Sequence, residues 1–172
     1  MSALFELVLK ELFELRMVQT DPNFANYRYR PASGEIVLLD FGATREFKAG
    51  FVNNYKRLAK AAIAGDEGRV AAAAEKLGYA VGEAGSDYRA LIMELFQLAL
   101  EPVREDVEYD FANSDMAANL SVLSEDLTGY SEFWQAPHTD ALYFHRKLGG
   151  MYLLATRLEA RVNLHRLITS LL

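Results

Sequence analysis

The sequence has no cysteine in its 172 residues, which excludes disulfide bonds and thiolate-bound metals. This absence fits a reducing compartment. Basic residues are also few: 18 lysines and arginines face 24 aspartates and glutamates, the net charge is −6, and no basic run exceeds two residues. Domains that bind nucleic acid normally carry a basic patch, so we expect no nucleic-acid partner.

Long hydrophobic runs are missing as well. The apolar segment Leu4–Leu15 is interrupted by four charged residues, and it lacks both the basic start of a signal peptide and the length of a membrane span. We therefore predict an amphipathic helix over Leu4–Val18, capped by Ser2. A hydrophobic content of 51% supports a sizeable core, and the length predicts a single domain over residues 1–172.

The most informative part of the sequence runs from position 19 to position 42. Asp21 precedes Asn26 by five residues, and Asp40 opens the tripeptide Asp-Phe-Gly. Phosphoryl transfer from ATP needs a carboxylate beside the attacking hydroxyl and oxygen ligands for the magnesium ions that neutralise the phosphates. Asp21 is the candidate catalytic residue, and Asn26 and Asp40 are the candidate ligands for metal and nucleotide.

A predicted β-hairpin brings these ligands together. Tyr27–Arg30 and Glu35–Leu39 are suited to short strands, and the Pro-Ala-Ser-Gly sequence between them is typical of a turn. A hairpin returns the end of its second strand to the start of its first, so Asp40 should lie next to Asn26. Each motif is weak alone, but in this order they match a kinase catalytic loop and metal-binding motif.

Two strings carry a closer resemblance. Gln-Thr-Asp-Pro-Asn-Phe-Ala-Asn at 19–26 and Leu-Leu-Asp-Phe-Gly-Ala-Thr-Arg-Glu-Phe at 38–47 resemble the UbiB/ADCK family of atypical kinases. Glu11–Arg16 is similar to the helix before that family's catalytic loop, and Ala61–Asp66 and His145–Gly150 are similar to its later helical part. The similarity covers most of the chain, and its specific part is 11–47.

The resemblance implies a mainly α (α+β) fold: a kinase-like C-terminal lobe with a small β-hairpin. It assigns Asp21 as the catalytic-loop aspartate and Asn26 and Asp40 as magnesium ligands, with Gln19 where ordinary protein kinases have histidine. It also implies ATP and Mg²⁺ as cofactors, a role in ubiquinone biosynthesis, and a lipid or quinone-precursor substrate. The implied location is cytoplasmic, peripheral to the inner membrane on the bacterial cytoplasmic or mitochondrial matrix side.

Several family features are missing from this sequence. The Lys-x-Gly-Gln motif, the alanine-rich nucleotide loop and the lysine–glutamate pair do not occur, which predicts a C-lobe without its N-lobe. We expect the isolated chain to bind ATP weakly or not at all, to turn over little of it, and to self-associate through the helix Leu4–Val18 or the cleft side. Ala-Pro-Glu is absent too, which favours small-molecule, lipid-linked or ATPase chemistry over peptide phosphorylation.

Two other functions stay open. A small-molecule kinase of the aminoglycoside or choline type shares the aspartate–asparagine spacing, although the Gln-Thr-Asp-Pro-Asn string argues against it. A non-enzymatic interaction module that docks a partner or a membrane is the other alternative.

Beyond the hairpin the pattern predicts helices. An apolar stripe from Phe51 ends at Gly65, and Asp66 caps the following helix. Further helices are predicted up to about Pro102, over Met116–Leu127, and as one or two long helices over Asp140–Leu172.

Three stretches between and within these helices have other expected roles. The acidic stretch Glu101–Asp115 should be a surface connection. We expect His145-Arg-Lys147 to cap or pair with this stretch rather than to bind phosphate or anionic lipid, and Gly149-Gly150 to permit close helix packing.

Overall fold

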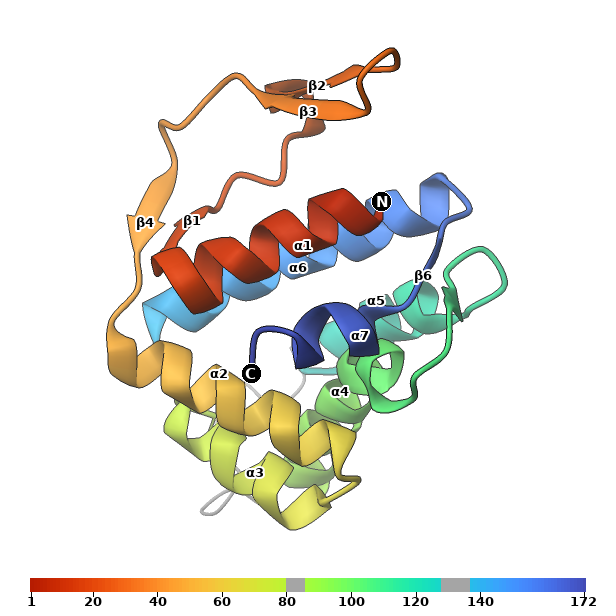
Figure 1. The fold of residues 1–172 in the computed structure, drawn as a ribbon. Coiled ribbons are helices and arrows are strands. Elements are labelled where there is room, and N and C mark those ends of the chain that lie inside the picture. The colour runs from red at the N-terminus through yellow and green to blue at the C-terminus, as the bar shows by residue number, and fades with distance from the viewer. Residues whose placement is uncertain (80–85, 128–136) are drawn as a thin grey trace.

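Helices dominate the computed structural model, which describes residues 1–79, 86–127 and 137–172 (Figure 1). The α-helices are α1 (Ser2–Lys10), α2 (Ala49–Ile63), α3 (Glu67–Lys76), α4 (Ser86–Arg104), α5 (Met116–Asp126), α6 (Thr139–Arg157) and α7 (Leu164–Thr169). A π-helical turn, η1 (Glu11–Leu15), extends α1, and a 3₁₀ turn, η2 (Phe24–Asn26), precedes the hairpin. None of the described helices is long and apolar enough to cross a membrane.

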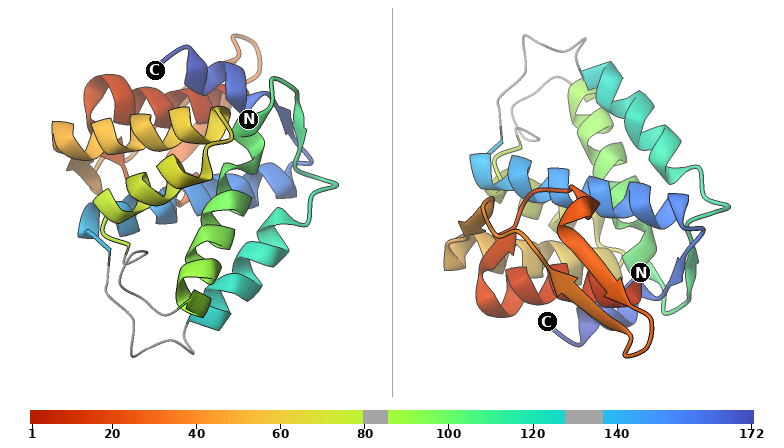
Figure 2. Two further views of the ribbon diagram at one scale, coloured as in Figure 1. Left: turned by 90° about the horizontal axis from the view of Figure 1, so that it is seen from below. Right: turned by 90° about the horizontal axis from the view of Figure 1, so that it is seen from above.

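Six short strands form three antiparallel pairs. They are β1 (Met17–Gln19) with β4 (Thr44–Glu46), β2 (Tyr27–Arg30) with β3 (Glu35–Leu38), and β5 (Tyr109–Asp110) with β6 (Arg161–Val162). The β2–β3 hairpin lies over one side of the helical body, where the Tyr27 hydroxyl accepts a hydrogen bond from Lys147 of α6, and β1 and β4 connect the hairpin to that body (Figures 1 and 2). This arrangement confirms the mainly helical fold and the predicted hairpin.

The core joins the two ends of the chain. Helix α1 packs against α7, and α2 packs against α3 and α4. Phe5 stacks on Phe111 with a ring-centroid distance of 5.7 Å and lies 6.0 Å from the ring of Tyr152. The helix boundaries follow the local signals: Gly65 ends α2 with φ of +66°, and the Asp66 side chain accepts a hydrogen bond from the Arg69 N–H at the start of α3.

Several local expectations are wrong. Met1, not Ser2, is the N-cap residue of α1, and no side chain caps the helix. The leading helix stops before Val18 because Arg16 adopts a left-handed conformation with φ of 55°. Residues 101–115 are more than a surface connection, since Phe111 is fully buried against Phe5. The prediction of one or two long helices over Asp140–Leu172 is confirmed for the 19-residue α6, but β6 follows it and α7 is only six residues long.

Most of the apolar side chains of the leading helix lie in the core of the protein. Five of its apolar side chains are buried within the chain: Phe5, Val8, Leu9, Leu12 and Phe13. Leu15 and Met17, at the end of the segment, remain 66% and 50% exposed. Leu4 and Leu7 are also partly exposed, so some apolar surface remains for self-association through this helix, which stays a prediction.

Candidate active site

The hairpin brings Asn26 and Asp40 to the same place. Its register pairs Tyr27 with Leu38, and the Leu39 N–H donates to the Asn26 carbonyl at 2.9 Å. Asp40 follows directly, so its backbone emerges beside Asn26. The turn chemistry of the sequence is the physical cause, because a short antiparallel connection must return the chain to its starting point.

A second pairing closes the loop from the other side. Strand β1 leads into Asp21 and β4 follows the Asp-Phe-Gly segment, with Gln19 opposite Thr44 in the register. The buried Thr20 adds two hydrogen bonds to the Ala43 carbonyl, from its backbone N–H at 3.1 Å and from its hydroxyl at 2.8 Å. Residues 20–26 and 40–42, which we call the catalytic loop and the metal motif after their predicted roles, are therefore held between two β-bridges.

The Asp21 carboxylate is partly buried and oriented by its own loop. Oδ2 accepts a hydrogen bond from the Asn26 side-chain amide at 3.0 Å, and Oδ1 accepts one from the Asn23 N–H at 3.2 Å. Because the amide nitrogen of Asn26 faces Asp21, its amide oxygen is left as an acceptor. That oxygen is the atom that would bind a cation.

Asp40 presents an exposed carboxylate. Its Oδ1 accepts a hydrogen bond from the Gly42 N–H at 2.7 Å, and a Cβ added to Gly42 would lie 3.1 Å from that oxygen. Glycine thus allows the chain to curl closely around the carboxylate. The second oxygen, Oδ2, accepts no hydrogen bond from the described residues, so it can act as a ligand.

Gln19 connects the two halves of the site. Its side chain is buried, its Oε1 accepts the Asp21 N–H at 2.6 Å, and its Nε2 donates to the Asp40 carbonyl at 3.4 Å. A neutral amide has both a donor and an acceptor, so it can bridge the loop that carries Asp21 to the backbone of Asp40. This is the position at which the resemblance places a histidine in ordinary protein kinases.

Lys147 is the residue of the site that the sequence did not reveal. It comes from α6, its side chain is 0% exposed, and Nζ donates to the Asp21 carbonyl at 3.1 Å and to the Tyr27 hydroxyl at 2.6 Å. The ammonium also lies 5.1 Å from the centre of the Tyr27 ring. The expectation that Lys147 would pair with the acidic stretch 101–115 is wrong. Its partners are in the catalytic loop and the hairpin.

Glu11 provides negative charge on the inner side of the same cluster. It is 7% exposed, and Oε2 has no hydrogen-bond partner within the described residues. Burial raises the pKa of Glu11 from 4.5 to about 7, while the charge of Lys147 and a hydrogen bond from the Gln19 backbone act to lower it. Burial also disfavours the charged form of Lys147 and so lowers its pKa, whereas the negative charges of Glu11 and Asp21 act to raise it. Glu11 and Lys147 are therefore a buried pair whose charges influence each other, without a direct ion pair between them among the described residues.

Glycine in α6 allows the catalytic loop to approach. A Cβ added to Gly150 would lie 2.6 Å from the Cβ of Pro22, whereas one added to Gly149 would meet nothing within 4 Å. The expectation of close packing at the glycine pair is confirmed at Gly150, where the neighbour is the catalytic loop rather than another helix.

Glu11 makes stability depend on pH. Its folded-state pKa of about 7 lies above the ordinary 4.5, so the folded protein binds more protons between these values. The contribution of Glu11 to the free energy of unfolding is therefore greatest below pH ~4.5 and is lost as the pH rises from there to about 7. Relative to Glu11→Gln, we expect the free energy of unfolding to fall by about 2 kcal/mol from pH ~5 to pH ~8, after allowance for solvent screening.

Urea unfolding at the two pH values measures this effect. Glu14→Gln is the matched control because Glu14 lies in the same helical turn and is exposed. Parallel pH profiles for the natural chain and Glu11→Gln would show that Glu11 is ionised in both folded and unfolded states.

Comparison with known proteins adds independent information. Residues 1–74 match a family model described as the ABC1 atypical kinase-like domain. The chain is 35% identical over 159 residues to "Atypical kinase COQ8B, mitochondrial" of Rattus norvegicus, covering 92% of this chain and 30% of that protein. It is 34% identical over 162 residues to "Atypical kinase coq-8, mitochondrial" of Caenorhabditis elegans, covering 92% of this chain and 21% of that protein.

A fungal relative gives the same result. The chain is 29% identical over 164 residues to "Atypical kinase COQ8, mitochondrial" of Saccharomyces cerevisiae, covering 95% of this chain and 33% of that protein. The chain thus spans about a third or less of the length of these curated relatives. The similarity nevertheless extends over almost all of the chain, helical part included.

Proposed function

Because this chain belongs to the UbiB/ADCK family of atypical kinases, we propose that it contributes the catalytic aspartate and magnesium ligands of an ATP-dependent phosphotransferase or ATPase. The observation that carries the proposal is the closure of the loop from both sides. The Leu39–Asn26 hydrogen bond and the β1–β4 pairing bring Asp21, Asn26 and Asp40 together from separate parts of the sequence.

The available oxygens suit magnesium. Mg²⁺ is usually held by one or two carboxylates, water and the substrate phosphates rather than by a cage of protein ligands. Asp40 offers an exposed carboxylate, and Asn26 offers its amide oxygen. Within the described ranges no three or more histidine, cysteine, aspartate or glutamate side chains gather as a metal site, which fits a site that the nucleotide completes.

Asp21 takes the role of the carboxylate beside the attacking hydroxyl. When bound, Mg²⁺–ATP supplies the phosphoryl group and neutralises its charge. Asp21 would accept the proton of the attacking hydroxyl or water, with its carboxylate held by the Asn26 amide and the Asn23 N–H. Catalysis of this kind depends on positioning, so the buried bonds from Gln19 and Lys147 would be part of the machinery.

We also propose a substrate and a place of action on the basis of the family. We include in the proposal a role in ubiquinone biosynthesis, with a lipid or quinone precursor as substrate, at the matrix or cytoplasmic face of the inner membrane. The word "mitochondrial" in the relatives' names supports such a location.

Binding of Mn²⁺–ATP, a paramagnetic stand-in for Mg²⁺–ATP, tests the proposal. In an isotope-labelled sample we expect selective broadening of the amide signals of Asn26, Asp40 and Gly42. Asp40→Ala should weaken binding about 10-fold or more, because a hydrogen-bonded or charged ligand contributes roughly 1.5–3 kcal/mol.

Asp115→Ala is the matched control. Asp115 is an exposed aspartate next to α5 that makes no side-chain capping bond, so its removal should leave both the broadening and the affinity unchanged. Circular dichroism confirms that each variant is folded. Broadening centred elsewhere, or equal affinity of the Asp40→Ala variant, would refute the assignment of the metal ligands.

A further inference from the structure

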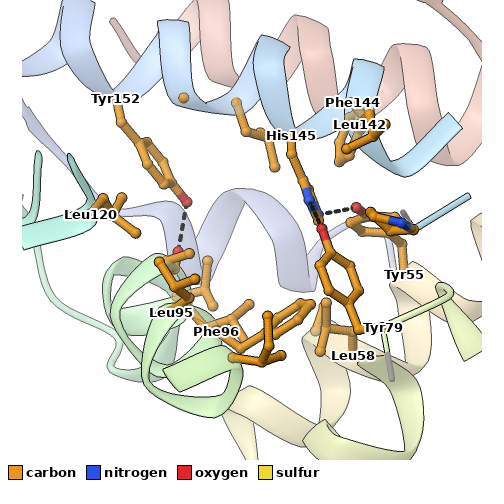
Figure 3. Close-up of a pocket in the computed structure, with 18 of the residues that line it drawn as sticks. Tyr55, Leu58, Tyr79, Leu95, Phe96, Leu120, Leu142, Phe144, His145 and Tyr152 are labelled. Atoms are coloured by element: carbon orange, nitrogen blue, oxygen red, sulfur yellow. Dashed lines mark hydrogen bonds between the residues drawn. The ribbon is translucent and has the colours of Figure 1, made fainter. Parts of the chain in front are cut away.

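A cavity in the helical body lies away from the catalytic loop. It is a partly open pocket of about 380 Å³, lined by side chains from six helices (Figure 3). Lining residues shown in the figure include Leu58, Leu95, Phe96, Leu120, Leu142 and Phe144. Protein interiors seldom hold voids much larger than a water molecule, and an engineered apolar cavity of roughly 150 Å³ already binds benzene. The volume here falls within the roughly 300–1,000 Å³ of small-molecule sites.

One wall of the cavity is polar. His145 lies between two tyrosines: the Tyr79 hydroxyl is 2.6 Å from its Nδ1, and the Tyr55 hydroxyl is hydrogen-bonded to its Nε2 (Figure 3). Tyr152, on the opposite side, donates its hydroxyl hydrogen to the Ala99 carbonyl at 2.9 Å. The hydrogen-bonded side chains of Tyr55, His145 and Tyr79 thus make this wall polar, in contrast to the apolar side chains named above.

A count of polar hydrogens shows that the hydrogen bonds among Tyr55, His145 and Tyr79 leave one hydrogen unused. A neutral imidazole has one N–H and one acceptor nitrogen. The three side chains together have three polar hydrogens, but the two bonds between them use only two. Whichever nitrogen of His145 carries the hydrogen, the tyrosine that accepts from it keeps its own O–H free. No acceptor for that hydrogen occurs among the described residues, and both tyrosines line the cavity.

The lining also defines the charge of a ligand. No aspartate, glutamate, lysine or arginine is among the described lining residues. Burial lowers the pKa of His145 to about 4, so the imidazole is neutral at pH ~7. An ionic ligand would lose its hydration without gaining a counter-charge, whereas an uncharged molecule would replace water at little cost.

We propose that this cavity binds an uncharged, mainly apolar molecule with one hydrogen-bond acceptor, such as a carbonyl or ether oxygen. The acceptor receives the free tyrosine O–H hydrogen, and the rest of the molecule occupies the apolar volume between α2, α4 and α6. None of Asp21, Asn26 and Asp40 lines the cavity, so this site is separate from the proposed phosphotransfer site and does not depend on it.

A pair of matched compounds tests the proposal on the full chain. Methyl heptyl ketone carries the acceptor, and the isosteric alkene, in which a methylene group replaces the carbonyl oxygen, lacks it. Each is used to displace N-phenylnaphthylamine, an uncharged fluorescent probe. The readout is the ratio of the two affinities, which is compared between protein variants so that differences in aqueous solubility cancel.

We expect the ratio of ketone affinity to alkene affinity to fall about 5-fold when the polar wall is removed, which corresponds to the loss of one hydrogen bond. The variant is the triple substitution Tyr55→Phe, His145→Leu and Tyr79→Phe. If it does not fold, His145→Met replaces His145→Leu in the triple variant, because a single tyrosine substitution would leave two polar hydrogens for one bond and therefore still a free donor. Tyr29→Phe is the control, because Tyr29 is 65% exposed on the hairpin and should leave the ratio unchanged.

A cavity-filling variant locates the binding. Ala99→Trp, or Ala59→Leu if the larger side chain prevents folding, should reduce probe binding at least 10-fold with the helical circular dichroism retained. Failure of the probe and both compounds to bind would overturn the proposal. An affinity ratio that is unchanged in the polar-wall variants would overturn the hydrogen bond. Binding that survives cavity filling would place the ligand elsewhere on the protein.

Discussion

Lys147→Met is expected to reduce the free energy of unfolding by about 3 kcal/mol at pH ~8, because it leaves two acceptors without their donor, at roughly 1–3 kcal/mol for each unsatisfied group, and removes the positive charge that acts on the buried Glu11. Methionine keeps most of the side-chain volume but leaves Glu11 buried without a counter-charge. It also removes the donor to the Asp21 carbonyl and the Tyr27 hydroxyl. The loss is therefore electrostatic and hydrogen-bonding in origin rather than a loss of packing.

Urea unfolding measures this change, and two further variants define its cause. Arg146→Met alters the adjacent, exposed residue of α6 and should change stability by no more than about 0.5 kcal/mol. The double variant Glu11→Gln/Lys147→Met removes the uncompensated carboxylate and should recover part of the loss. Equal stabilities of the Lys147→Met and Arg146→Met variants would show that the buried pair is not a stabilising element.

The same variant has a consequence for function. Lys147 holds the backbone carbonyl of the residue proposed as the catalytic aspartate, Asp21, from a helix 126 residues further along the sequence. We describe it as a positioning residue. If the proposed function is right, Lys147→Met should also weaken Mn²⁺–ATP binding, because Asn26 is hydrogen-bonded to the same Asp21.

Gly150→Ala has the second large expected effect. The added methyl would lie 2.6 Å from the Cβ of Pro22, a ring atom that cannot rotate away, so the catalytic loop must shift. Overpacking of this kind costs about 1–3 kcal/mol. Gly149→Ala, one residue earlier in the same helix, meets nothing within 4 Å and should stabilise the protein by about 0.5–1 kcal/mol through helix propensity.

The pair of glycine variants separates packing from helix propensity. Both gain the same propensity, so their difference in unfolding free energy, about 1–3 kcal/mol, reports the contact with Pro22. Amide chemical shifts of Asn23 and Asn26 should move in Gly150→Ala and stay in place in Gly149→Ala. Two equally stabilised variants with unchanged spectra would mean that the loop does not depend on this contact.

Local signals in the sequence determined much of this protein. The turn between Tyr27–Arg30 and Glu35–Leu38 predicted the hairpin, and the hairpin brings Asp40 back to Asn26. Gly65 and Asp66 predicted a helix end and the next helix cap. These features were predictable because turns, caps and hairpins depend on residues a few positions apart.

Tertiary structure decided the rest, since contacts between distant residues leave no periodic trace in one sequence. Lys147 reads as a surface charge in its helix, and only the approach of α6 to the catalytic loop gives it Asp21 and Glu11 as neighbours. Phe111 lies in an acidic stretch, yet it fills the core beside Phe5. The cavity likewise requires six helices to meet, because its volume is what remains between their packed side chains.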